Sequence, residues 1–257
     1  MTTAPASARI GGLIGNASLL LVLAAWQLVA QTTLSGILPG PITVGTSLFW
    51  LLQEKAFLFD LLASALRVAG SLAAAMLIGG LLALLPYWVP CLNGTVHGAI
   101  KPFFNSFPAI AWALLASIWF GVSNFTVVFV QTAILIPFCL VNISEGVRLL
   151  DRDLLEMGRS FTARSNRIFT SITIPLLLPY IVSALRSAYG VAWKIALVAE
   201  LFGAQSGLGF AMLRAENVAD TTGVLAICLM IVIVGLAGDR FIIQPLDRRT
   251  QGISSIG

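Results

Sequence analysis

Long stretches of this chain carry no charge, and this constrains its fold more than any other feature. No charged residue occurs between Ile10 and Gln53. Charged residues make up 10% and hydrophobic residues 58% of the 257 residues, whereas soluble domains contain about 25% charged residues. A soluble core of this size could not bury so much apolar surface, but a bilayer can. We therefore expect an all-α, polytopic membrane protein.

Six apolar stretches have about the 20-residue length that a helix needs to cross the hydrocarbon core. The predicted spans are Leu13–Ala30, Leu61–Leu85, Pro102–Gly121, Phe125–Ile143, Pro179–Glu200 and Thr222–Phe241. The first ends before Pro39-Gly40-Pro41. Its Leu28-Val29-Ala30 sequence resembles a signal-peptide cleavage site, but we expect this segment to remain as an anchor helix.

Positive charges predict how the spans are oriented. Two cations, Lys55 and Arg214, lie on one side of the predicted bilayer. Ten lie on the side that holds both termini: Arg9, Lys101, Arg148, Arg152, Arg159, Arg164, Arg167, Arg240, Arg248 and Arg249. Since cytoplasmic loops carry the excess of Lys and Arg, we expect both termini to be cytoplasmic.

Residues that could do chemistry are few and scattered. Cys91, Cys139 and Cys228 are far apart, and His97 is the single histidine, so no spacing indicates a metal site. Nothing resembles a phosphate-binding P-loop. The net charge of +4 reflects loop arginines that orient the chain, so we expect no nucleic-acid partner.

The loop over residues 144–178 is the most polar part of the chain. Five arginines fall from Arg148 to Arg167, and residues 153–169 favour an amphipathic helix, with acidic residues at its start where they suit the helix dipole. Such a helix could press its small and apolar face into a groove of a partner. It could equally lie among lipid headgroups, and the pattern alone leaves both interpretations open.

A resemblance decides between them. The cytoplasmic loop of ABC importer permeases has the pattern EAA, three residues, Gly, nine residues, then I-x-L-P. Here Glu156-Met157-Gly158 holds the EAA place, Thr162 the glycine place, and Ile172-Thr173-Ile174-Pro175 the I-x-L-P place. Met157, Gly158 and Thr162 depart from the pattern. The resemblance extends over residues 39–245 and is closest to the nitrate, sulfonate and taurine subgroup.

The resemblance implies a type I ABC importer permease fold with six transmembrane helices, in a bacterial-type inner membrane. It implies one permease domain over residues 1–257, with a core at about 60–245 and a coupling loop at 144–178. A dimer of separate cytoplasmic ATPases would hold ATP and Mg²⁺, and this chain would hold no cofactor. Further partners would be a second permease, identical or related, and an extracytoplasmic substrate-binding protein. The implied coupling residues are Glu156, Met157, Gly158, Arg159, Ser160, Phe161, Thr162, Ala163 and Pro175.

Charged and aromatic residues inside the spans are candidates for the translocation pathway. Arg186, Trp193 and Glu200 are spaced by seven residues, so they share one helix face. That face could line the pathway or a dimer seam, or its end residues could reach toward the interfaces. Three cations against Glu200 favour a small anionic solute. The pathway candidates are Arg67, Arg186, Trp193, Lys194 and Glu200.

Three other functions compete with an ABC permease. A self-contained secondary transporter or channel would show inverted repeats and broken helices, and no repeat is apparent. A membrane enzyme would need clustered acids, bases or metal ligands. A non-transporting partner permease in a heterodimer would be consistent with Thr162 at the glycine place.

Overall fold

The computed structural model describes residues 6–32, 38–150, 156–158, 160 and 165–248, which form helices and no strand. The chain divides into two compact units. The first comprises residues 1–58 and 211–230, and the second comprises residues 59–210 and 231–257.

The first unit contains two packed apolar helices, α1 (Ala6–Thr32) and α2 (Pro41–Leu51). Proline at the first position of α2 has the backbone angle that a helix start needs. Gly40 precedes it and lies against α1, where a Cβ atom would be 2.7 Å from the Gln27 side-chain oxygen. The sequence did not predict α2. The unit also contains most of α11 (Leu208–Asn217) and the first half of α12 (Thr221–Gly238).

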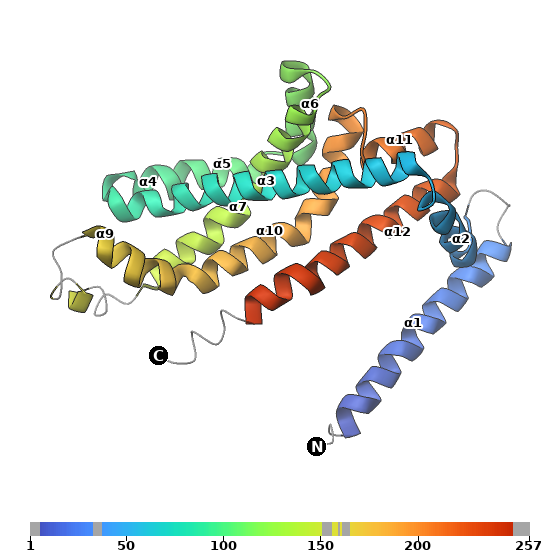
Figure 1. The fold of residues 1–257 in the computed structure, drawn as a ribbon, viewed down its shortest axis with the longest axis horizontal. Coiled ribbons are helices and arrows are strands. Elements are labelled where there is room, and N and C mark those ends of the chain that lie inside the picture. Colours follow the sequence, from blue (N-terminus) through green and yellow to red (C-terminus); the bar gives the residue numbers. More distant parts are fainter. Residues whose placement is uncertain (1–5, 33–37, 151–155, 159, 161–164, 249–257) are drawn as a thin grey trace. The chain divides into compact units, whose positions relative to one another are not determined.

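The second unit is built around two long helices that pack against each other, α7 (Asn124–Arg148) and α10 (Ile174–Gly203) (Figure 1). The helix α6 (Ala109–Phe120) contacts both. Buried alanines and valines of α6, α7 and α10 form one apolar cluster around Trp112. This unit also holds most of α3 (Lys55–Trp88) and the short helices α4 (Asn93–Thr95), α5 (Lys101–Ser106) and α9 (Ser165–Ile168).

Four helical segments of the described residues are long and apolar enough to cross a membrane: Lys55–Trp88, Asn124–Arg148, Phe169–Gly203 and Thr221–Arg248. They contain the second, fourth, fifth and sixth predicted spans, so these four predictions are confirmed as apolar helices. The predicted first span lies in α1, of which Leu20–Thr32 counts as a shorter apolar helix. The total of six crossings therefore stays a prediction.

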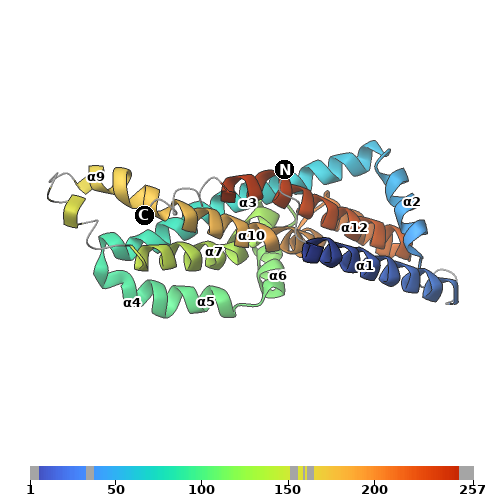
Figure 2. The same ribbon diagram turned by 90° about the horizontal axis from the view of Figure 1, so that it is seen from below.

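The predicted third span, Pro102–Gly121, is wrong as a single helix. The helical segments Pro90–Ser106 and Ala109–Phe120 meet at an angle of 86°, and α6 leaves the direction of α5 at this break (Figures 1 and 2). Proline restricts the residue before it to extended geometry, and Phe107 has φ −77° and ψ 124°. Pro108 therefore ends α5 and becomes the residue that caps α6.

Three five-residue π-helical turns interrupt the α-helices of the second unit: η2 (Val96–Ile100), η3 (Phe169–Thr173) and η4 (Asp239–Ile243). Each ends two residues before a proline, namely Pro102, Pro175 and Pro245. A proline within a helix lacks the N–H that would bond the carbonyl four residues earlier, and its ring crowds that carbonyl. A wider turn relieves this conflict, so each proline accounts for the π turn before it.

Gly79 allows α3 to approach α7 closely. A Cβ atom at this position would lie 2.8 Å from Cβ of Cys139 and 2.9 Å from the backbone oxygen of Ile136. The neighbouring Gly80 has more room, since its nearest atom would be 3.5 Å away. Of the two consecutive glycines, only Gly79 is therefore required for this contact.

We predict that Gly79→Ala destabilises the chain by about 1–3 kcal/mol, because one extra carbon overpacks the α3–α7 contact. Thermal unfolding in detergent, followed by size-exclusion chromatography, measures the effect. Gly70→Ala on the same helix is the matched control, since nothing lies within 4 Å of a Cβ there. Equal melting temperatures for the two variants would contradict the predicted contact.

Candidate functional site: the coupling segment and the charged residues of the spans

The predicted coupling residues lie partly within the described structure. Glu156, Met157, Gly158 and Ser160 are helical, and we call these residues the coupling segment. Pro175 lies in the first turn of α10. Arg159, Phe161, Thr162 and Ala163 lie outside the described residues. Both Glu156 and Met157 are exposed, and Met157 keeps 51% of its accessible surface. These two side chains are therefore available to a partner.

Gly158 is buried and attaches this helical turn to the start of the next helix. A Cβ atom there would lie 2.5 Å from Cδ1 of Ile172 and 3.7 Å from Cγ2 of Ile168. Ile172 is the first residue of the I-x-x-P sequence, so the two halves of the family pattern touch each other. Glycine stands at the alanine place of the pattern because the Ile172 side chain occupies the space that the alanine methyl group would need.

The helix that receives Gly158 runs without a break from Ser165 through α9, η3 and α10 to Gly203. Its segment Phe169–Gly203 is long and apolar enough to cross a membrane. A displacement applied at Ile168 or Ile172 therefore acts directly on one end of this long helix.

Among the pathway candidates, Arg67 and Glu200 form a buried ion pair between α3 and α10. Arg67 Nη1 lies 2.8 Å from Glu200 Oε1, and the side chains keep 6% and 0% of their accessible surface. The guanidinium also donates to the Asn124 side chain and to the backbone and side-chain oxygens of Ser206. All five of its N–H groups thus have acceptors, and none is left for a solute.

The Glu200 carboxylate is equally well satisfied. It accepts hydrogen bonds from Ser64 at 2.8 Å and from the backbone N–H of Gly209 at 2.9 Å, besides that from Arg67. Gly207 lies against the same carboxylate with φ +107° and no room for a Cβ atom. Glycine is needed there for both its conformation and its size.

Sequence reasoning missed Asp60 and Asn124 as members of this network. Asp60 is buried, with 5% of its surface accessible, and accepts from the Gly207 N–H at 2.7 Å. Asp60, Ser64 and Arg67 recur at helical spacing on one face of α3. This spacing was a usable signal, but the predicted span began at Leu61 and left Asp60 in a loop.

Arg186 and Trp193 lie in different environments, although the seven-residue spacing places them on one face. Arg186 is about half exposed and pairs with Asp247 at 2.6 Å. Trp193 is buried, and its indole N–H donates to the Tyr189 hydroxyl at 3.0 Å. That hydroxyl in turn donates to the Val234 carbonyl at 3.2 Å, which connects α10 to α12.

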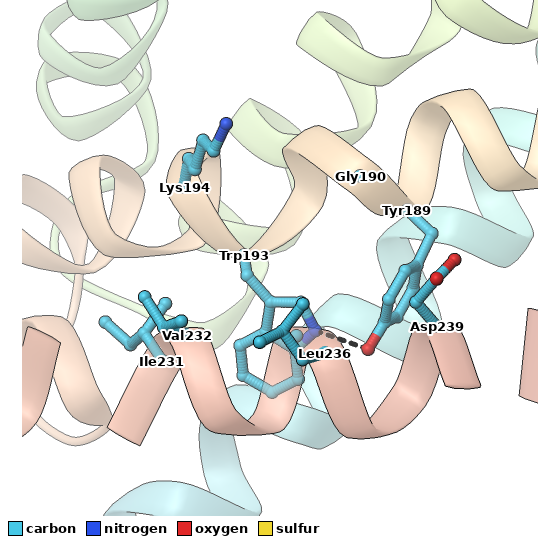
Figure 3. Close-up of a pocket in the computed structure, with 9 residues that line it drawn as sticks. Tyr189, Gly190, Trp193, Lys194, Ile231, Val232, Leu236 and Asp239 are labelled. Carbon is cyan, nitrogen blue, oxygen red and sulfur yellow. Dashed lines mark hydrogen bonds between the residues drawn. The ribbon is translucent and has the colours of Figure 1, made fainter. Parts of the chain in front are cut away.

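Tyr189 and Trp193 border a cavity of about 310 Å³. In Figure 3 both side chains extend toward the helix that carries Val232 and Leu236. The Lys194 side chain leaves α10 in another direction. Lys194 is exposed, and its ammonium has no ion-pair partner among the described residues. The structure thus pairs Arg67 and Arg186 but leaves Lys194 unpaired, while their roles in a pathway stay predictions.

We predict that Glu200→Gln destabilises the chain by about 3–5 kcal/mol, because it leaves the Arg67 guanidinium buried without a counter-charge. The double variant Arg67→Met/Glu200→Gln should be more stable than Glu200→Gln alone, since it removes both charges. Thermal unfolding in detergent tests both statements. The single variant Arg67→Met completes the comparison. If the stability lost in the double variant equals the losses of Arg67→Met and Glu200→Gln added together, the two charges do not interact.

Comparison with known proteins identifies the family. The model of the binding-protein-dependent transport system inner membrane component matches residues 92–251. An ABC transporter permease protein of Brucella melitensis is 29% identical over 244 residues, which cover 95% of this chain and 98% of that protein. The aliphatic sulfonates transport permease protein SsuC of Escherichia coli is 30% identical over 225 residues, 85% of this chain and 83% of SsuC.

A solved structure supports the fold. The MetNI methionine ABC transporter, solved in inward-facing conformations, matches with a TM-score of 0.56 and 19% identity, covering 77% of this chain and 97% of the matched chain. The long apolar helices of the structure are those expected of an inner membrane component, and the family model covers most of them. The chain belongs to the family of binding-protein-dependent transport system inner membrane components, the permeases of ABC importers.

Proposed function

We propose that this chain is the permease subunit of an ATP-driven importer and forms the route for a small anionic solute. One observation carries the coupling part of this proposal. Glu156 and Met157 are exposed on a helical turn that packs through Gly158 against the start of a helix long enough to cross a membrane. A partner that binds this turn can therefore move a transmembrane helix.

The partner in this proposal is a dimer of separate cytoplasmic ATPases, which bind ATP and Mg²⁺. Closure of the two ATPases around ATP would draw together the coupling segments of two permease chains, identical or related. The spans would then rock between outward and inward access, and an extracytoplasmic binding protein would deliver the solute. Residues 1–257 act here as one permease domain with both termini in the cytoplasm.

Lys194 supports an anionic solute. An ionisable side chain within a span is costly in lipid, so it faces a water-filled route or a partner. The ammonium of Lys194 is exposed and unpaired among the described residues, whereas Arg67 is neutralised by Glu200. SsuC, whose name states that it transports aliphatic sulfonates, provides an example of an anion in this family. We therefore infer that Lys194 attracts the solute and that Arg67 and Glu200 hold the helices together.

We predict that Glu156→Lys abolishes recovery of the ATPase when the tagged chain is purified in mild detergent and its partners are identified by mass spectrometry. The substitution reverses the charge of an exposed side chain in the coupling segment. Glu216→Lys, at an exposed glutamate of α11, is the matched control and should retain the ATPase. Recovery of equal amounts with both variants would refute docking at Glu156.

We predict that Lys194→Met lowers the initial rate of anion uptake about five-fold or more, because charge attraction near a protein surface is worth roughly 1–4 kcal/mol. Lys194→Arg keeps the charge and should keep most of the rate. Proteoliposomes loaded with the complete complex and supplied with an alkanesulfonate, taurine or nitrate provide the measurement. Unchanged uptake of every transported anion by Lys194→Met would remove this residue from the route.

A further inference from the structure

Three aromatic rings join the end of α3 to the start of the long helix that follows the coupling segment. The ring centroids of Trp88 and Phe169 are 5.3 Å apart, and those of Tyr87 and Phe169 are 6.1 Å apart. The Tyr87 hydroxyl also lies 3.4 Å from the hydroxyl of Thr173, which is completely buried. We call Tyr87, Trp88 and Phe169 the aromatic contact.

The turn around Phe169 has two neighbouring sides with different partners. Ile168 and Ile172, four residues apart, lie against Gly158 of the coupling segment. Phe169 and Thr173, also four residues apart, face the end of α3. Residues four apart lie on one side of a helix. This single turn is therefore placed between the coupling segment and α3.

On both sides of the aromatic contact the backbone lacks part of the regular α-helical hydrogen bonding. Phe169–Thr173 is the π turn η3, which Pro175 accounts for, and π turns occur frequently at functional sites. On α3, Pro86 precedes Tyr87 directly and lacks the N–H that would bond Leu82. Because the backbone hydrogen bonds of a helix run within that helix, the two helix ends are connected through their side chains.

The aromatic contact lies at the edge of the packed interior. Trp88 keeps 49% of its accessible surface, whereas the core clusters consist of residues with less than 10%. A half-exposed ring such as that of Trp88 adds less to folding stability than a buried ring does. Stacked and edge-on aromatic pairs nevertheless hold two elements in a defined geometry. The arrangement suits a contact that transmits displacement more than one that stabilises the core.

We propose that Tyr87, Trp88 and Phe169 transmit the ATPase-driven displacement of the coupling segment to α3. This inference rests on the proposed function. The coupling segment would move α10 directly, because η3 and α10 are one continuous helix. The aromatic contact would make α3 follow, and the Arg67–Glu200 pair already ties α3 to α10 at a second point. The residues act as positioning residues, since they touch neither solute nor nucleotide.

The test uses the complete complex of permeases, ATPases and binding protein in proteoliposomes. We expect Trp88→Ala and Phe169→Ala each to lower the solute taken up per ATP hydrolysed about three- to ten-fold, the range that one aromatic pair supports. Recovery of the ATPase and basal ATP hydrolysis should stay at the wild-type values, and the melting temperature should fall by no more than a few degrees. Phe169→Tyr, which keeps the ring, should restore coupling.

The double variant Trp88→Ala/Phe169→Ala should be no worse than Phe169→Ala alone, because Phe169→Ala already removes both ring contacts between the two helices. Trp50→Ala is the matched control, since Trp50 is exposed and stacks edge-on with Phe49 on α2. Unchanged coupling in the single variants, losses that multiply in the double variant, or loss of the ATPase from the variants alone would overturn the inference. A wild-type complex without an ATPase would instead contradict the proposed function.

Discussion

A charge inside a bilayer is stable only when a counter-charge neutralises it and hydrogen bonds occupy its donors and acceptors, and the Arg67–Glu200 pair meets both conditions. The pair connects α3 and α10, and its hydrogen bonds add the start of α7 at Asn124 and the turn at Ser206. Breaking it would leave several buried polar groups without partners at once. The arrangement of the second unit therefore depends on it.

This network also separates structural charges from functional ones. Arg67 was one of three cations that favoured an anionic solute, but its donors are fully used within the chain. Arg186 is paired with Asp247. The charge argument for an anion consequently rests on Lys194, whose ammonium is exposed and unpaired in the described part of the chain.

The long apolar helices could be predicted because their length and lack of charge reflect the bilayer directly. The break in the third span could not be predicted in this way. Pro108 and the extended Phe107 turn the chain by 86° inside a stretch whose composition is apolar throughout. Pairing of Arg67 with Glu200, 133 residues away, depends on tertiary packing that no local pattern encodes. The coupling segment was found through a family pattern, and only the structure shows why Gly158 stands in place of alanine.

We propose that this permease works only when a separate ATPase moves its coupling segment. ATP-dependent uptake of a labelled alkanesulfonate, taurine or nitrate by proteoliposomes tests it directly. The chain purified alone and the chain with its co-purifying ATPase and binding protein would be compared. We expect the complete complex to take up at least one of these anions, and only when ATP is present on the side of the membrane that holds the ATPases. Uptake by the chain alone, driven by an ion gradient without ATP, would instead identify a self-contained secondary transporter.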